Sequence, residues 1–119
     1  MEKVKLAEKF ALFSEQWQPK IVGELDNYHV KIAKIEGEFV WHKHDDEDEL
    51  FMVVDGRLTI HFRDRAVELV PGEFIVVPKG VEHKPSASEE CQILMIERKG
   101  TLNTGDQRDS AMTAEPEVI

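Results

Sequence analysis

The chain has 119 residues, a net charge of −9 at neutral pH and an isoelectric point near 5.0. This length suits one domain with its own hydrophobic core and excludes two full domains. The apolar fraction is 41% and the charged fraction 33%, which is typical of globular rather than disordered chains. Because an acidic surface repels nucleic acid and anionic membranes, we expect neither as a partner.

The first residues give no sign of a secretory signal, since they are charged where a signal needs an apolar stretch. No run approaches the roughly 18 apolar residues of a membrane span. The single cysteine, Cys91, excludes an internal disulfide and fits a reducing compartment. We therefore expect a cytoplasmic protein.

Residues 1–19 carry a broken helical stripe that ends before Pro19. Its apolar residues, three or four apart, are Leu6, Phe10, Phe13 and Trp17. We expect this segment to form a short strand or helical turn that packs on the domain or on a dimer partner.

Between residues 20 and 98 the apolar pattern changes to period two, and short runs rich in Val, Ile and Phe are separated by turn signals. The predicted strands are 20–25, 28–36, 38–44, 49–54, 57–63, 66–70, 73–77, 82–86 and 91–98. Asp55-Gly56 predicts a two-residue hairpin, because that turn needs positive φ. Many short strands with frequent turns indicate an all-β sandwich or barrel. Residues 99–119 are polar, include the turn-like Asn103-Thr104-Gly105-Asp106, and predict a tail that is ordered only where it docks.

A group of potential metal ligands lies within the predicted strands. His42 and His44 are two residues apart, so on a strand both side chains point to the same face. Glu49 opens the next predicted strand, and His83 opens another after Pro78-Lys79-Gly80. Three imidazoles and one carboxylate suit a borderline divalent metal, whose open positions can admit substrate, water or dioxygen.

The spacing of these residues resembles a known family. Gly37-x4-His42-x-His44-x4-Glu49-x6-Gly56 resembles the first motif of the cupin superfamily, and Gly72-x5-Pro78-x-Gly80-x2-His83 resembles the second. The short stretch between the motifs is like that of small single-domain bacterial cupins, the cupin 2 conserved barrel. Glu47 is a rival ligand of the same strand parity as Glu49, and the spacing to Gly56 favours Glu49. The second motif departs at Ala87, where relatives often carry Asn.

The resemblance implies a double-stranded β-helix, or jelly-roll barrel, with the ligands inside. It assigns His42, His44, Glu49 and His83 as ligands of one divalent ion, which is Fe, Mn, Ni, Zn or Cu. It also implies a homodimer that packs or exchanges N-terminal strands, and a small-molecule ligand or substrate.

Other residues are candidates for the pocket over the metal. Val40, Phe51 and Val53 share strand faces with predicted ligands, while His61 points either into the barrel near the site or out to water. Met52 and Met95 are weaker candidates, and an apolar lining suits an apolar or aromatic ligand better than a polyol. The remaining expectations are a core position for Cys91 rather than a ligand or redox role, an outward position for Trp41 and a surface position for His29.

Three functions fit this sequence. The first is an enzyme acting on a small molecule, dioxygenase-like or isomerase-like, and the family analogy favours it. The second is a non-catalytic module that binds or senses a small ligand. The third is a structural or accessory protein whose metal stabilises the barrel. No Lys, Tyr or Asp has a spacing that identifies it as a catalytic acid or base.

Overall fold

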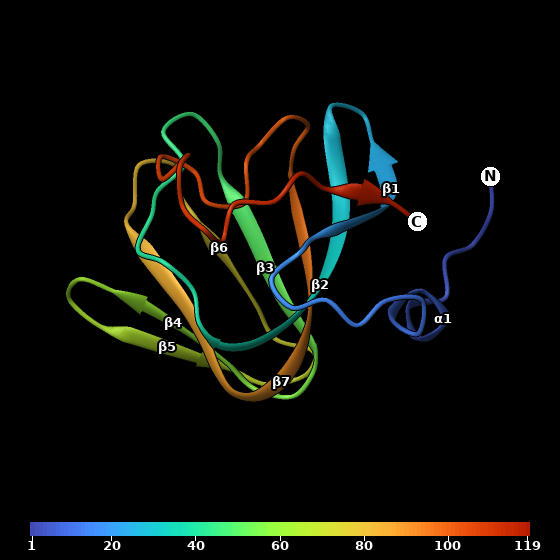
Figure 1. The fold of residues 1–119 in the computed structure, drawn as a ribbon, viewed down its shortest axis with the longest axis horizontal. Coiled ribbons are helices and arrows are strands. Elements are labelled where there is room, and N and C mark those ends of the chain that lie inside the picture. Colours follow the sequence, from blue (N-terminus) through green and yellow to red (C-terminus); the bar gives the residue numbers. More distant parts are fainter.

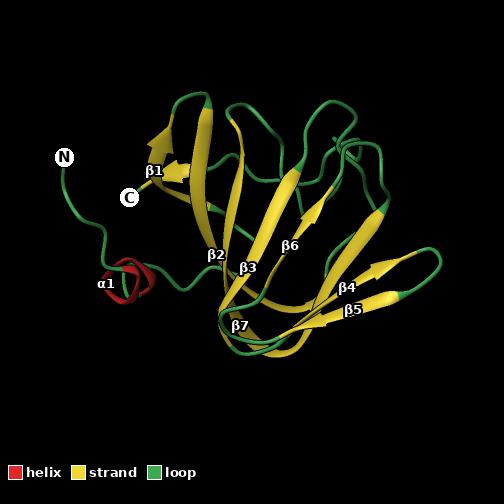
Figure 2. Ribbon diagram, turned by 180° about the vertical axis from the view of Figure 1, so that it is seen from behind, coloured by secondary structure: helices red, strands yellow, loops and turns green.

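The computed structural model describes residues 1–119 as an all-β jelly-roll barrel with one short helix (Figures 1 and 2). The elements are α1 (Leu6–Phe10), β1 (Lys20–Leu25), β2 (Tyr28–Glu38), β3 (Glu49–Asp55), β4 (Leu58–Phe62), β5 (Ala66–Leu69), β6 (Phe74–Val77), β7 (His83–Arg98) and β8 (Glu117–Val118). The sheet runs β5-β4-β7-β2-β1-β8, and β3 joins it by pairing with β7 and β6. No helix has the length and apolarity needed to cross a membrane.

The long strand β7 connects the two halves of the barrel. Its first part pairs with β4, from Phe62–His83 to Thr59–Ser86, and its last part pairs with β3, from Val53–Ile93 to Glu49–Glu97. Two strands, 82–86 and 91–98, were expected here with a turn between them. Their polar connection instead stays extended, and β2 pairs with β7 on both sides of an irregularity between Ile35 and Gly37.

The segment between β2 and β3 corrects another expectation. Residues 38–44 are predicted as a strand, yet Glu38 ends β2, and beyond it only an isolated bridge between His42 and His83 forms. The segment crosses from one strand to the next, and Phe39 bonds through its backbone N–H to the carbonyl of Pro85 at 3.0 Å. It therefore runs beside the start of β7 rather than within a continuous ladder.

Two hydrophobic clusters stabilise the fold. The larger one fills the barrel and includes Phe51, Val53, Leu58, Ile60 and Ile93. The smaller one joins Phe10 and Phe13 of the N-terminal segment to Ile32 on the outside of β2. The helix α1 lies beside the barrel, and both chain ends lie on that same side (Figure 1).

Candidate metal centre

The backbone brings two of the predicted ligands together directly. The N–H of His42 donates to the carbonyl of His83 at 3.0 Å, and the N–H of His83 donates to the carbonyl of His42 at 2.8 Å. Their rings are 4.3 Å apart between centroids. The carbonyl of His44 accepts the N–H of Gly80 at 2.8 Å, which fixes the other end of the His42–His44 pair against the turn before β7.

The four predicted ligands meet inside the barrel. His42, His44, Glu49 and His83 are between 0% and 4% exposed, and one potential ligand atom from each lies within 4.8 Å of the others. Glu49 Oε1 is 3.1 Å from His44 Nε2 and 3.5 Å from His83 Nε2. Glu47, the rival ligand, is half-buried and does not belong to this group.

Three atoms of this group are buried without a hydrogen-bond partner outside the group itself: His44 Nε2, Glu49 Oε1 and His83 Nε2. Unpartnered polar atoms are costly inside a protein, so a convergent set of them calls for a missing partner. A divalent cation would satisfy two nitrogen lone pairs and a carboxylate at once. The donor set therefore fits the metal that the sequence predicts.

Backbone carbonyls set the orientation of two imidazoles. His42 Nδ1 lies 2.9 Å from the carbonyl oxygen of Val40, and His83 Nδ1 lies 2.9 Å from that of Val81. A carbonyl only accepts, so each Nδ1 carries the proton and donates. Each Nε2 is then left with a lone pair, the form in which imidazole binds a metal.

The protonation of the site follows from its burial. Burial, together with the charge of His83, lowers the pKa of His42 to about 4. Burial alone would raise the pKa of Glu49, but the neighbouring His44 and His83 outweigh it and hold that pKa well below the usual value. For His44, burial works in the opposite direction, and the Glu49 carboxylate outweighs it to raise the pKa.

These shifts predict how metal affinity depends on pH. In the metal-free protein His44 holds a proton below its raised pKa, and an incoming metal must displace that proton. Affinity should therefore fall by up to about tenfold per pH unit as the pH drops through this pKa. The charge of Glu47 also raises the pKa of His44, so the Glu47→Gln variant should move the fall to lower pH. Zn²⁺ titrations at a series of pH values measure both, and an affinity that stays flat down to pH 5 contradicts the prediction.

A buried ion pair adjoins the site and was missed in the sequence. Lys31 and Glu97 are each 1% exposed, and Lys31 Nζ donates to Glu97 Oε1 at 2.8 Å. Glu97 faces Glu49 across the β3–β7 ladder. Burial and the Glu49 charge raise the pKa of Glu97 well above its usual value, against the effect of Lys31. Glu97 Oε2 is buried and has no hydrogen-bond partner.

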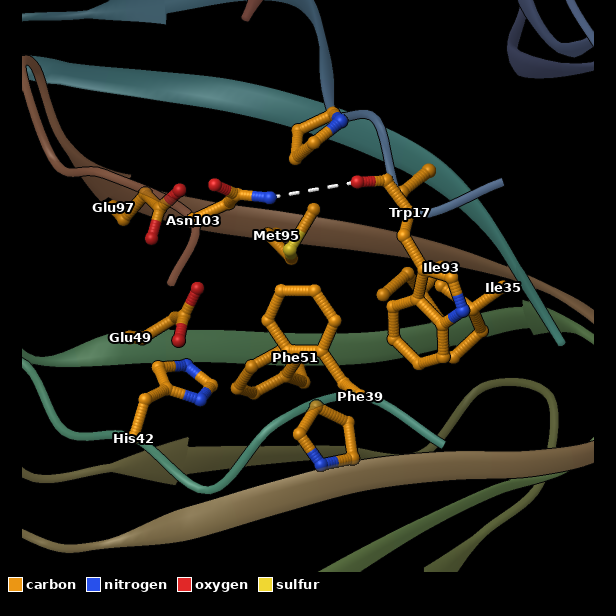
Figure 3. Close-up of a pocket in the computed structure, with 13 residues that line it drawn as sticks. Trp17, Ile35, Phe39, His42, Glu49, Phe51, Ile93, Met95, Glu97 and Asn103 are labelled. Carbon is orange, nitrogen blue, oxygen red and sulfur yellow. Dashed lines mark hydrogen bonds between the residues drawn. The ribbon is translucent and has the colours of Figure 1, made fainter. Parts of the chain in front are cut away.

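A narrow cavity leads to the four predicted ligands, which are called the metal group below (Figure 3). Its volume is about 30 Å³, within about 400 Å³ of space between atoms that is partly open to solvent. The lining residues are Trp17, Pro19, Ala33, Ile35, Phe39, His42, Glu49, Phe51, Pro85, Ile93, Met95, Glu97 and Asn103. In Figure 3 the polar His42, Glu49 and Glu97 lie at one end, and Trp17 and Ile35 lie at the other.

Of the four predicted pocket residues, Phe51 lines this cavity, and Val40, Val53 and His61 do not. Val40 contributes its carbonyl to His42 instead, and Val53 is fully buried in the core. His61 Nε2 lies 2.9 Å from the Ser86 hydroxyl on the β4–β7 ladder.

The remaining side chains singled out in the sequence do not belong to the ligand group. Met95 lines the cavity and Met52 does not. Cys91 is buried in the core, where burial raises the pKa of its thiol to about 11. Trp41 packs against the Arg63 guanidinium at 3.8 Å from the ring centre, and His29 Nε2 lies 3.7 Å from Glu24.

The tail closes the back of the site. Asp106 N–H donates to the carbonyl of Lys43 at 3.0 Å, and the Asp106 carboxylate accepts the N–H of Lys43 at 2.9 Å. Gly105 packs so tightly here that a Cβ on it would lie 2.2 Å from the carbonyl oxygen of Lys43. Asn103 donates to the carbonyl of Met112 at 3.0 Å, which holds its side chain against the cavity.

Replacing Gly105 by alanine should detach this part of the tail. The new methyl group would strike backbone rather than a flexible side chain, and the φ of +54° also disfavours alanine. We expect a loss of about 1–3 kcal/mol in the free energy of unfolding and weaker metal binding. Gly100→Ala is the control, because Gly100 also has positive φ but open space around it. Equal effects of the two changes in urea unfolding and Zn²⁺ titration would contradict the role of this contact.

Fold and site together define a small jelly-roll protein with three histidines and one glutamate inside the barrel that could hold a metal ion. The chain belongs to the cupin domain family, whose model matches residues 28–97.

Three relatives illustrate this membership. A cupin-2 domain containing protein from Shewanella frigidimarina has 50% identity and a TM-score of 0.80, over 81% of this chain and 94% of that one. Protein NMB1881 from Neisseria meningitidis has 30% identity and a TM-score of 0.76, over 82% of this chain and 100% of that one. The uncharacterised protein YdbB of Bacillus subtilis (strain 168) is 33% identical over 93 residues, which are 77% of this chain and 76% of YdbB.

Proposed function

We propose that the protein is a metal-dependent enzyme that transforms a small molecule at a centre formed by His42, His44, Glu49 and His83. The observation that carries this proposal is the set of three unpartnered buried ligand atoms, one of which belongs to Glu49 in the wall of a cavity. When bound, a divalent ion would supply Lewis-acid chemistry, or redox chemistry if it is Fe, Mn, Ni or Cu. The chain's own residues orient the ligands, exclude bulk water and shape the cavity.

The cavity argues against a purely structural metal. A structural site is closed on all sides by protein ligands, whereas His42 and Glu49 both face a cavity that opens to solvent. Small molecules can therefore approach the metal group from this side. The alternative proposal, a non-catalytic cupin that binds or senses a small ligand, uses the same cavity without turnover.

The lining favours oxygenase-like over isomerase-like chemistry. A sugar isomerase must hydrogen-bond several hydroxyl groups, but most residues along this cavity are apolar. Structures with the same fold include hydroquinone 1,2-dioxygenase PnpCD, solved with Cd²⁺ and 4-hydroxybenzonitrile, and a putative sugar phosphate isomerase from Acidithiobacillus ferrooxidans. Their identities of 19% and 23% indicate a shared fold, and a fold hosts many chemistries.

The test is metal analysis of the purified protein followed by a substrate panel under air and under nitrogen. Oxygen uptake that needs a redox-active metal supports the oxygenase, and turnover under nitrogen supports the isomerase. Ligand binding without turnover across the panel supports the sensing module. If the His42→Ala variant kept its turnover, the proposed mechanism would be wrong. A homodimer and a cytoplasmic location remain predictions, and ultracentrifugation and cell fractionation test them.

A further inference from the structure

The apolar end of the cavity is built from rings in fixed positions. Trp17 stacks on Phe39 with centroids 4.8 Å apart and an angle of 19° between the rings. Phe39 in turn meets His42 edge-on at 5.3 Å, so a row of rings leads from the outer wall to the metal group. Narrow space between aromatic and aliphatic side chains accepts flat molecules more readily than thick ones.

Trp17 is held in place from several sides. Its backbone has a φ of +61°, which is uncommon for a residue other than glycine and is seen at functional positions. Its backbone N–H donates to the carbonyl of Lys34 at 2.8 Å, and its indole Nε1 donates to the carbonyl of Glu36 at 2.9 Å. The indole therefore presents a preset wall rather than a side chain that fills leftover space.

The polar end offers one buried oxygen atom without a partner. Lys31 occupies only Oε1 of Glu97, and Oε2 remains buried and unpartnered in a residue that lines the cavity. A hydroxyl or N–H group on a ligand would satisfy Oε2 and remove the cost of leaving it bare. A ligand without such a donor would leave that cost in place.

We propose that the cavity selects a flat, largely apolar molecule with a hydroxyl or N–H group at one end, and that Trp17, Phe39 and Glu97 determine this specificity. The ring of the ligand lies along Trp17 and Phe39, and its donor group binds Oε2 of Glu97. The proposal rests on the proposed function in one respect, because the metal fixes which end of the ligand reacts.

The tryptophan content of the chain makes this measurable. Trp17 and Trp41 are the two tryptophans, and Trp41 lies against Arg63 away from the cavity. In the Trp41→Phe variant, fluorescence excited at the long-wavelength edge of tryptophan absorption therefore reports on Trp17. The Zn²⁺-loaded variant is titrated with phenol, with anisole, which has the same ring without a donor, and with sorbitol. Zn²⁺ content is measured separately on the same samples.

We expect a saturable change with phenol, binding of anisole weaker by about tenfold, and no change with sorbitol. Glu97→Gln should reduce the preference for phenol over anisole, and Glu89→Gln, at an exposed position, should leave it intact. Equal binding of phenol and anisole, or binding of sorbitol, refutes the specificity even where Zn²⁺ is held. Absence of Zn²⁺ binding with the phenol preference intact refutes the metal centre instead. Because the phenol–anisole comparison needs no mutation in the cavity, it stands even where Glu97→Gln fails to fold.

Discussion

Replacing His83 by alanine should abolish the stabilisation of the protein by metal. A metal that binds only the folded state adds about 2.7 kcal/mol when its free concentration is about 100 times its dissociation constant. For a chain of this size, that gain raises the midpoint of thermal unfolding by roughly 10 °C. Removing a residue that only hydrogen-bonds to a metal ligand already lowers metal affinity by about 10–100-fold. Loss of the His83 imidazole itself should therefore lower metal affinity by at least about 100-fold.

The matched control is His61→Ala. Both side chains are imidazoles next to the β4–β7 ladder, but His61 bonds to Ser86 and does not belong to the ligand group. Each variant is compared with itself, with and without added Zn²⁺, so that any cost of the cavity left by the buried His83 ring cancels. A full thermal shift in His83→Ala, or its loss in His61→Ala, would show that the metal binds elsewhere.

The ligand set could be predicted because sequence spacing and strand geometry specify it together. Two histidines separated by one residue stay on one side of the chain even though the segment between β2 and β3 forms a single bridge and not a strand. The same irregularity explains why Val40 does not line the cavity. Strand parity assigned Val40 to the pocket, but without a continuous strand that parity does not hold, and the carbonyl of Val40 orients His42 instead.

The cavity wall depends on contacts between distant parts of the chain. Trp17 belongs to a segment with helical spacing, but its φ is positive and its indole stacks on Phe39, which local spacing does not predict. Asn103 lies in a polar tail whose docking cannot be read from local composition. Glu97 and Lys31 did leave a signal, because each continues the inward-facing alternation of its strand, after Ile93 and Met95 in β7 and before Ala33 and Ile35 in β2.

Replacing Lys31 by methionine should destabilise the fold strongly. The change leaves Oε1 of Glu97 buried without the Lys31 ammonium that donates to it, and breaking a buried pair from one side costs about 3–5 kcal/mol. The pair of Lys84 and Glu38, at 3.0 Å and with side chains 19% and 68% exposed, is the control, and Lys84→Met should cost less than about 1 kcal/mol. Urea unfolding of both variants measures the difference, and a small effect of Lys31→Met would show that the Lys31–Glu97 pair does not stabilise the fold.

The double variant Lys31→Met/Glu97→Leu separates stability from function. Apolar residues of similar volume often replace a buried ion pair with no net loss, so the second change should recover most of the stability that the first removes. The same double variant should still bind Zn²⁺ through the four ligands but lose its preference for phenol over anisole. If stability does not require this buried pair, its position where the cavity meets the metal group is best explained by ligand binding. Recovery of the phenol preference together with stability would remove Glu97 from the binding site and leave the pair without that role.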